Sequence, residues 1–377
     1  MSTDTRHIVV LGGGALGIST AAHLIRKGVD VTVVTEAELA SGASGRSLSW
    51  LNSAGERSQE YHDFRLAGID RYRELKAAHP DSDWLEFGGG VFWGTGAEAA
   101  RDRHDAEVAK DYASQLLDPQ SLSEVVPGLN AVAVDSAAVF NPEEGWVSLP
   151  HLIDHLSAQI TEGGGLIVTG AGRSSVLTEG GRALGVRTAS GEEHRGDAVV
   201  VACGPQTPAV VAELGVRLED ASPLSMLVIS EPFEVPERVV LNTPRAAVRP
   251  NPGSTIAIDH DWYEDQIVTN EDGTYDIPQE TVDELVAEAA RLYAGEPGIR
   301  AAGWKIGLKP IPGDGEPVFG ELDSVPGCYA IFTHSGATLA LIGGELVANE
   351  LVDGVKEEML ATFRPERFGQ SQVAAAS

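Results

Sequence analysis

Three glycines close to the N-terminus constrain this chain more than any other feature of its sequence. Gly12, Gly14 and Gly17 follow the short apolar run at residues 7–11, and a helical pattern begins with Ala15. A G-x-G-x-x-G spacing between a strand and a helix is typical of a Rossmann phosphate loop, where the glycines permit a tight turn and the close approach of a pyrophosphate. The helix N-terminus adds free N–H groups and a partial positive charge. The sequence therefore predicts a dinucleotide-binding βαβ unit.

An acidic residue at the end of the next strand supports this prediction. Residues 30–35 are apolar and β-branched, as in a parallel strand buried on both faces, and Glu36 follows them. Glu36 stands 19 positions after Gly17 (36 − 17), close to the roughly 20 positions typical of the ribose-binding acid. Because a carboxylate accepts hydrogen bonds from a ribose diol, we expect a cofactor with a free 2′-hydroxyl group.

The loop after Glu36 favours FAD over NAD. Residues 41–52, SGASGRSLSWLN, form a run of small residues where an NAD-dependent dehydrogenase is expected to begin another regular βαβ step. Such a loop can wrap closely around a bulky cofactor. Ser44 and Ser47 are its candidate hydrogen-bonding residues, and Arg46 is a candidate charge near the phosphates. The alternative is a plain surface loop rich in turn-forming residues.

Composition excludes several classes of partner. The 377-residue chain carries 27 lysines and arginines against 56 aspartates and glutamates, a formal net charge of -29. A field of that sign repels nucleic-acid phosphates and anionic lipid headgroups, so we expect no nucleic-acid and no membrane partner. Cys203 and Cys328 are the only cysteines, too few for a disulfide framework or a multi-cysteine metal site. We therefore expect a cytoplasmic protein that holds no metal.

Six segments of the chain resemble the FAD-dependent D-amino acid oxidase superfamily, which includes glycine oxidase, sarcosine oxidase and related amino acid dehydrogenases. In chain order they are VVLGGGALGISTAAHLIRKGVDVTVVTE, SGASGRS, FNPEEGWVSLPHLIDHL, DAVVVACGPQT, GWKIGLKPIPGDGEPVFG and THSGATLALIGGELVANEL. Their order and spacing are specific to the superfamily and not to one substrate.

The resemblance implies a set of cofactor-binding residues. Ala15 and Leu16 lie at the pyrophosphate with the three glycines, Glu36 at the ribose, and the backbone of Val176 at the adenine. The resemblance also implies that four residues of the second loop line its flavin side: Ser44, Arg46, Ser47 and Leu48. The turn before the last long helix is implied to face the pyrimidine edge of the flavin with Ser335, Gly336, Ala337, Thr338 and Leu339. A helix N-terminus suits that edge because it stabilises the negative charge of a reduced flavin.

The fold that we expect is α/β with two interleaved domains, which suits a chain longer than the roughly 100 to 200 residues of one domain. A Rossmann-type FAD-binding domain takes residues 1–83, 148–220 and 310–377. A mainly antiparallel β-sheet domain for the substrate takes residues 84–147 and 221–309, where short strand-like pieces are broken by proline and glycine.

The chemistry implied by the superfamily is hydride transfer from a carbon that bears an amine to the flavin, which leaves an imine. No dedicated general base is required, but an amino acid substrate needs a cation for its carboxylate. Lys309 occupies the position where glycine oxidase-like members carry a carboxylate-binding arginine, and Arg249 is the second candidate. Lysine lacks the bidentate fork of arginine, which weakens the inference of an α-amino carboxylate. For either cation the alternative is an exposed surface charge.

Two further residues are candidates for the site. His334, before the Ser335 turn, is a candidate to position flavin or substrate, with a structural hydrogen-bonding role as the alternative. Trp50 is a candidate wall of the flavin pocket or an ordinary core tryptophan.

Two departures from the superfamily bear on the chemistry. The segment GWKIGLKP shows no cysteine where sarcosine oxidase-like members attach FAD covalently, so we expect noncovalent FAD. The segment STIAIDH lacks the lysine that activates oxygen in that branch, so oxidase and dehydrogenase outcomes stay open.

The function predicted is therefore oxidation of a C–N bond of an amino acid or related amine to an imine, with electrons passed to oxygen or a carrier. The alternatives are an NAD-dependent dehydrogenase, a flavin-dependent monooxygenase and a catalytically silent flavin-binding subunit. The first does not explain the SGASGRS and THSGATL segments. For the second we find no G-D-A-x-H motif before the last helix.

Overall fold

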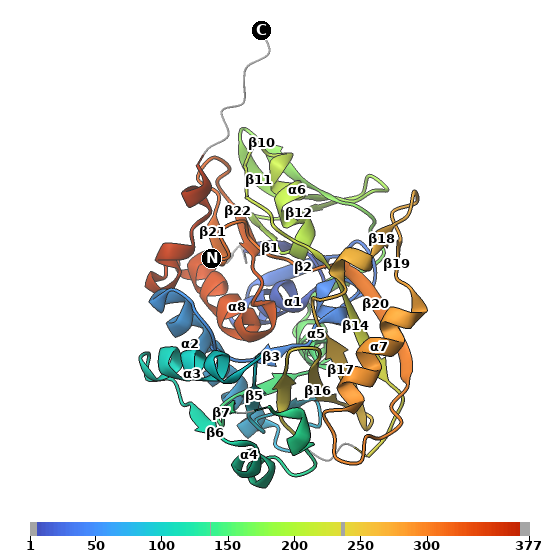
Figure 1. Ribbon diagram of the computed structural model, residues 1–377. Helices are drawn as coiled ribbons and strands as arrows, with labels where there is room; N and C mark the ends of the chain where they lie inside the picture. The colour runs from blue at the N-terminus through green and yellow to red at the C-terminus, as the bar shows by residue number, and fades with distance from the viewer. Residues whose placement is uncertain (1–5, 136, 235–237, 370–377) are drawn as a thin grey trace. The chain divides into compact units, whose positions relative to one another are not determined.

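The computed structural model describes residues 6–135, 137–234 and 238–369 (Figure 1). These residues form two compact units. Unit 1 contains the described parts of residues 1–45, 149–223 and 308–377, and unit 2 those of residues 46–148 and 224–307. An α/β fold with parallel and antiparallel sheets was expected, and the structure confirms it.

A six-stranded sheet forms the centre of unit 1, in the order β21-β22-β13-β1-β2-β9. Its described strand pairs are parallel except for β21 and β22. The strands are β1 (His7–Leu11), β2 (Asp30–Val34), β9 (Leu166–Val168), β13 (Ala198–Val201), β21 (Val318–Glu321) and β22 (Cys328–Phe332). Valine-rich runs suit this position because strands covered on both faces need apolar side chains on both sides. Val10 illustrates the register, since it lies between Val33 and Val200.

Different layers cover the two faces of this sheet (Figure 1). On one face α1 (Ala15–Arg26) packs between α5 (Leu149–Glu162) and α8 (Gly336–Asp353). On the other lies the antiparallel sheet β10 (Ser175–Glu179), β11 (Arg182–Arg187) and β12 (Glu193–Arg195). Helices α1 and α8 approach closely, because a Cβ atom on Gly344 would lie 2.6 Å from the Oγ of Ser19. Glycine thus brings an early and a late segment of the chain into contact.

The short helices of unit 1 are α6 (Thr207–Ala212) and the 3-10 turns η3 (Gly204–Gln206), η5 (Glu358–Phe363) and η6 (Pro365–Phe368). A further 3-10 turn, η1 (Ala43–Arg46), carries the chain out of this unit.

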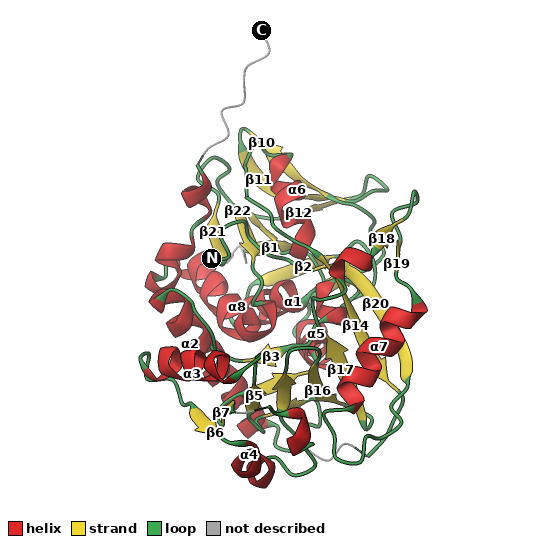
Figure 2. Ribbon diagram, viewed as in Figure 1, coloured by secondary structure: helices red, strands yellow, loops and turns green. Residues whose placement is uncertain are grey.

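Unit 2 is built on an eight-stranded sheet in the order β20-β14-β17-β16-β15-β5-β7-β6 (Figure 2). The strands are β5 (Gly90–Phe92), β6 (Gln115–Leu117), β7 (Ala138–Asn141), β14 (Leu224–Ser230), β15 (Val240–Asn242), β16 (Ala247–Asn251), β17 (Thr255–Asp259) and β20 (Ala301–Leu308). Of its described pairs, β5 with β15 is parallel and the others are antiparallel. A mainly antiparallel sheet agrees with the prediction from the short strand-like pieces of this part of the sequence.

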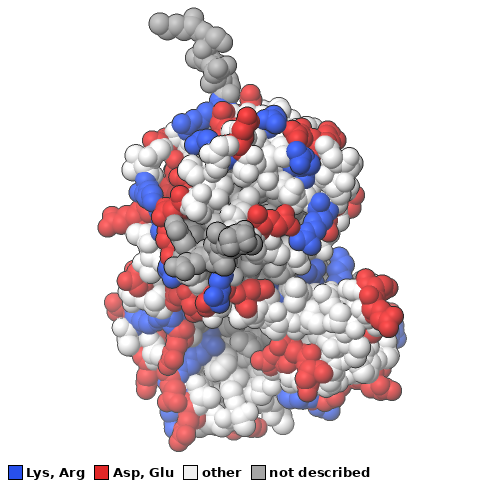
Figure 3. All heavy atoms as spheres, turned by 90° about the horizontal axis from the view of Figure 1, so that it is seen from above, with Lys and Arg blue, Asp and Glu red and all other residues white. Residues whose placement is uncertain are grey.

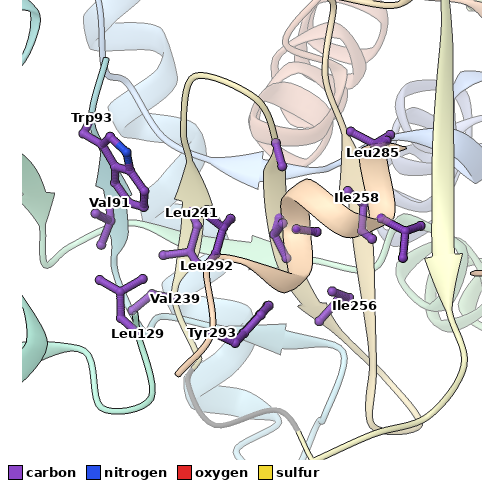
Figure 4. Close-up of a cluster of buried hydrophobic side chains, with 14 of the residues drawn as sticks. Val91, Trp93, Leu129, Val239, Leu241, Ile256, Ile258, Leu285, Leu292 and Tyr293 are labelled. Carbon is purple, nitrogen blue, oxygen red and sulfur yellow. The ribbon is translucent and has the colours of Figure 1, made fainter. Parts of the chain in front are cut away.

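The core of unit 2 lies between this sheet and α7 (Gln279–Ala290). Figure 4 shows the inward side chains, among them Ile256 and Ile258 of β17 and Leu285 of the helix. They are fully buried. At about 25 cal/mol for each Å² of apolar surface removed from water, such side chains stabilise the unit by about 1.5–3 kcal/mol each.

The remaining elements of unit 2 are shorter or peripheral. The helices are α2 (Gln59–Ala78), α3 (Ala97–Val108) and α4 (Pro119–Val125), with 3-10 turns η2 (Ala131–Ala133) and η4 (Glu264–Gln266). The strands are β3 (Trp50–Leu51), β4 (Leu85–Glu86), β8 (Gly145–Val147), β18 (Val268–Thr269) and β19 (Tyr275–Asp276).

The units differ from the predicted domains at residues 46–83, 148, 221–223 and 308–309. Residues 46–83, expected with the first domain, belong to unit 2, because β3 pairs with β8 and β8 also pairs with β4. Residues 221–223 and 308–309 belong to unit 1, where the Lys309 N–H donates to the Pro223 carbonyl at 2.8 Å. The unit boundaries follow these backbone hydrogen bonds and not the change of sequence pattern along the chain.

The described residues also bear on membranes and surface charge. Across residues 6–135, 137–234 and 238–369, no helix is long and apolar enough to cross a bilayer. On the face drawn in Figure 3, acidic and basic side chains are interspersed.

Candidate functional site

The glycine loop has the geometry that the sequence predicts. Gly12 has a φ of +127°, and a Cβ atom there would lie 2.2 Å from the Ala202 carbonyl oxygen at the end of β13. A Cβ atom on Gly17 would lie 2.2 Å from the carbonyl oxygen of Gly12. No larger residue fits either position without moving backbone. The loop is therefore held tightly against the carboxyl ends of the strands, the edge where open α/β sheets bind ligands.

The N-terminus of α1 suits a phosphate. Gly14 is the N-cap and provides no side-chain hydrogen bond, and the first turn carries no acidic residue. Ser44 lies here, since its Oγ accepts a hydrogen bond from the Ala15 N–H at 3.0 Å. The second loop thus returns to the first, and Ser44, expected on the flavin side of that loop, lies at the N-terminus of α1. A pyrophosphate at this place would meet helix N–H groups and the Ser44 hydroxyl, with no nearby carboxylate in the first turn to repel it.

Glu36 lies at the same edge of the sheet. Its side chain is exposed directly after the buried strand β2. Its charge adds to the effect of burial, which raises the pKa of Cys203 at the end of β13 to about 12. The segment before β10 runs beside it, because the Gly172 N–H donates to the Glu36 carbonyl at 2.9 Å. Val176 follows in β10 opposite Val186. The residues expected at ribose and adenine therefore belong to neighbouring segments of unit 1.

The C-terminal turn forms a second helix start in unit 1. Ser335 is the N-cap of α8 without a side-chain cap bond, and the first turn has no acidic residue. Gly336 lies beside α1, because a Cβ atom there would meet the Leu16 Cδ1 atom at 3.7 Å. Thr338 and Leu339 are buried behind this turn, Ala337 is half-buried, and His334 is exposed. The helix start predicted at the pyrophosphate and the helix start predicted at the flavin edge thus lie together.

The remaining predicted residues of the second loop belong to unit 2. Arg46 packs against Gly307 of β20, where a Cβ atom would lie 2.3 Å from the Arg46 Nε atom. Burial lowers the pKa of Arg46. The Oγ of Ser47 accepts the Ser49 N–H at 3.1 Å. The Leu48 carbonyl accepts a hydrogen bond from the Nε of Arg249.

Arg249 is a buried cation with neutral partners. It lies on β16 and is 2 % exposed. One terminal nitrogen donates at 2.8 Å to the Pro250 carbonyl and at 2.8 Å to the Asn251 Oδ1. Within the described part of the chain, no carboxylate forms an ion pair with it, and burial lowers its pKa to about 9. An arginine this deeply buried is normally paired with an anion.

Lys309 has a different setting. It belongs to unit 1, directly after β20, and its side chain is half-buried rather than fully exposed. Lys309 and Arg249 are therefore carried by different units.

Trp50 belongs to a polar cluster that the sequence did not reveal. Its Nε1–H donates to the buried carboxylate of Glu144 at 2.7 Å, and the Tyr112 hydroxyl donates to the same carboxylate at 2.7 Å. The segment FNPEEGWVS contains two adjacent glutamates, Glu143 and Glu144, and only Glu144 is buried. The local sequence does not show which glutamate is buried, because the burial of Glu144 comes from β5 and from the residues after α3.

The structure also places the cysteines and the side chains that could bind a metal. Cys203 and Cys328 are free thiols at the end of β13 and within β22. Within residues 6–135, 137–234 and 238–369, no group of three or more His, Cys, Asp or Glu side chains is arranged to hold a metal.

Comparison with known proteins identifies relatives along nearly the whole chain. The family described as DAO, FAD dependent oxidoreductase, matches residues 7–350. An uncharacterized oxidoreductase of Bacillus subtilis, YurR, is 24% identical over 381 residues, which cover 95% of this chain and 98% of the relative. D-amino acid dehydrogenase of Cereibacter sphaeroides is 30% identical over 216 residues, 54% of this chain and 46% of that protein.

A solved structure shares the fold. The L-amino acid deaminase of Proteus myxofaciens, solved in complex with anthranilate, superimposes with a TM-score of 0.83 at 19% identity, covering 97% of this chain and 94% of that one. The glycine loop, the exposed Glu36 and the two uncapped helix starts fit the phosphates, ribose and flavin edge of a dinucleotide.

Proposed function

Because this chain belongs to the family of FAD dependent oxidoreductases, we propose that it oxidises a C–N bond of an amino acid or related amine to an imine. Its cofactor is FAD. The chemistry supplied by bound FAD is acceptance of a hydride from the carbon that bears the amine, and the electrons then pass to oxygen or another acceptor. D-amino acid dehydrogenase among the relatives supports amino acids as the substrate class.

The observation that carries the substrate proposal is the buried, unpaired charge of Arg249. Its three described hydrogen bonds go to neutral oxygens. A substrate carboxylate would supply the missing counter-ion and a charge-assisted hydrogen bond. We therefore rank Arg249 above Lys309 as the carboxylate anchor, since a planar guanidinium suits a carboxylate better than an ammonium group does. Lys309 is the alternative, and a matched variant separates the two.

The proposed cofactor contacts follow the geometry of each unit. The phosphates are assigned to the glycine loop with Ala15, Leu16 and Ser44, the ribose to Glu36 and the adenine to the Val176 backbone. The flavin is assigned to Arg46, Ser47 and Leu48 with the turn of Ser335, Gly336, Ala337, Thr338 and Leu339. Trp50 is proposed as a wall of the flavin pocket, and His334 as a residue that positions flavin or substrate.

The two thiols support a noncovalent flavin in a reducing compartment. Burial raises the pKa of Cys203 and of Cys328 to about 12, so neither forms an appreciable thiolate at neutral pH. A thiol that stays protonated is a poor nucleophile for covalent attachment. We accordingly propose bound, noncovalent FAD and a cytoplasmic location, where free cysteines persist.

The test is an anaerobic screen of the purified, FAD-loaded protein. D- and L-amino acids, N-methyl amino acids and amines without a carboxylate are added separately, and flavin absorbance is followed. Bleaching by a carboxylated amine, weaker with its decarboxylated counterpart, is the expected result. Dithionite provides the control for a reducible flavin. If dithionite reduces the flavin and no compound of the panel does, the protein is a silent flavin-binding subunit. Substrate-dependent NADPH consumption would identify a monooxygenase.

A further inference from the structure

Glu144 is a buried carboxyl group that receives two hydrogen bonds from distant parts of unit 2. It lies in the tight turn between β7 and β8, with 0 % of its surface exposed. Its Oε2 accepts the Nε1–H of Trp50 at 2.7 Å, and its Oε1 accepts the Tyr112 hydroxyl at 2.7 Å. Each oxygen thus faces a neutral donor, an arrangement that suits an ionised carboxylate.

The backbone of β5 closes the third side of this carboxyl group. A Cβ atom on Gly90 would lie 2.1 Å from the Glu144 Oε2 and 3.0 Å from the Trp50 Nε1. Only glycine leaves room for the indole and the carboxyl group to meet there. The contact is therefore built into the sheet rather than formed by a flexible surface side chain.

Tyr112 ties the same segment a second time. Its hydroxyl oxygen accepts the Ser53 N–H at 3.0 Å while its proton goes to Glu144. Asn52, between these two attachment points, is held by buried Arg65 of α2, whose Nε donates to the Asn52 carbonyl at 2.7 Å. Residues 50–53 are thus fixed from three directions.

The charged neighbours of Glu144 leave it without an ion-pair partner at hydrogen-bonding distance among the described residues. Arg103 of α3 donates instead to Glu107 at 2.8 Å, while its guanidinium lies 5.6 Å from the Trp50 ring centre. Burial raises the pKa of Glu144 to about 8, and nearby Arg103 and the Tyr112 hydroxyl oppose that rise. Glu107 adds a smaller raising effect and the indole a lowering one.

Two side chains of α2, those of His62 and Arg65, act on the Glu144 cluster through Tyr112. The His62 ring meets the Tyr112 ring edge-on, with 5.5 Å between the ring centres. Burial lowers the pKa of His62, so it is neutral near pH 8. Arg65 acts on Tyr112 as a nearby positive charge. The titration expected near neutral pH in this cluster therefore belongs to Glu144.

We infer that Glu144 is a positioning residue: its carboxylate holds the indole of Trp50 in place, and protonation of the carboxyl group weakens that hold. The inference rests on the proposed function, in which Trp50 is a wall of the flavin pocket. Trp50 can only donate at Nε1, and a bond to a carboxylate is roughly twice as strong as one to a neutral carbonyl. Protonation of Glu144 also places the carboxyl proton against the Tyr112 hydroxyl, because the Trp50 Nε1 cannot accept it. The Tyr112 hydroxyl must then stop donating to Glu144.

The experiment observes the indole N–H directly. The FAD-loaded full chain is labelled with ¹⁵N in the indole ring of its 6 tryptophans, and their N–H resonances are recorded from about pH 6 to about pH 10. Trp50→Phe identifies the Trp50 resonance by its absence. The Trp50 resonance is expected to shift with a midpoint near 8, the pKa of Glu144, while the other resonances stay in place.

Three variants decide the outcome. Glu144→Gln abolishes the transition of Trp50, whereas the matched control Glu143→Gln, an exposed neighbour paired with Arg73, leaves it unchanged. Tyr112→Phe removes one donor to the carboxylate, so it moves the midpoint to higher pH. A flat Trp50 resonance, or a transition that persists in Glu144→Gln, overturns the inference, as does a midpoint that Tyr112→Phe leaves in place.

The result is separable from the proposed reaction. If no amine reduces the flavin and the Trp50 resonance still titrates through Glu144, the assigned reaction fails and the hold on Trp50 stands. If amines reduce the flavin and Trp50 does not titrate, the reaction stands and the positioning role is wrong.

Discussion

The guanidinium carbon of Arg249 lies 5.3 Å from the centre of the Trp146 ring. An aromatic face stabilises a cation without neutralising it, by about 0.5–2 kcal/mol. Arg249 is therefore held in a buried place while its charge stays available to an anion. Trp146 lies on β8, which begins directly after Glu144, so the ring beside the proposed anchor stands two positions after Glu144 in the chain.

Replacing Arg249 is expected to weaken binding of carboxylated substrates. A hydrogen bond to a charged group contributes about 1.5–3 kcal/mol, so Arg249→Met should raise KM for an amino acid by roughly 10- to 100-fold. The same variant should leave KM for an amine without a carboxylate nearly unchanged. Steady-state kinetics on the two substrate types measures the difference. Lys309→Ala is the matched variant: if it raises KM and Arg249→Met does not, Lys309 is the anchor.

Adding one methyl group at Gly17 should prevent FAD binding. The Cβ atom of Gly17→Ala would lie 2.2 Å from the Gly12 carbonyl oxygen, so the phosphate loop must shift. Overpacking of this kind costs about 1–3 kcal/mol of stability. Gly42→Ala is the control, because a Cβ atom there meets nothing within 4 Å. Flavin content after purification and the melting temperature report the effect, and a Gly17→Ala protein with full flavin would contradict it.

Glu36→Ala should lower FAD affinity without unfolding the protein. The side chain is exposed, so its removal leaves no cavity, while the hydrogen bonds to the ribose are lost. A loss of about 1.5–3 kcal/mol corresponds to roughly 10- to 100-fold in Kd. Titration of apoprotein with FAD, followed by flavin fluorescence, gives Kd. Unchanged affinity would remove Glu36 from the ribose site.

Glu144 should make the protein less stable as pH rises. Its pKa goes from 4.5 in a solvated chain to about 8 when folded, so the folded state binds the extra proton between these values. The free energy of unfolding then falls with pH in this window by up to about 1.4 kcal/mol per pH unit. Urea unfolding at several pH values, compared between wild type and Glu144→Gln, isolates this slope. Parallel curves for the two proteins would contradict it.

Local spacing was sufficient to predict the nucleotide end of the fold. Gly12, Gly17 and Glu36 lie within one βαβ unit, where short-range spacing specifies both the turn and the strand that follows. The fold class, the family and the FAD cofactor followed from this unit and from the order of the other segments, and the comparisons confirm them.

Contacts between segments that are distant along the chain could not be predicted from local spacing. The burial of Glu144 depends on Trp50, Gly90 and Tyr112, none of which is its neighbour along the chain. The neutral environment of Arg249 likewise depends on Leu48, 201 residues away. A pattern of residue types reports the period of an element, but it does not report which polar side chains its partners will enclose.

The contact between α1 and α8 has a consequence for the making of this protein. The phosphate loop, residues 12–17, is synthesised before α8, residues 336–353, which begins 319 positions later (336 − 17). At about 5–20 residues per second, the two are separated by tens of seconds. During that interval Ser19 and its neighbours on α1 lack the surface that later covers them. Flavin capture is therefore expected to be a late event, and nascent chains that stop before α8 should emerge colourless.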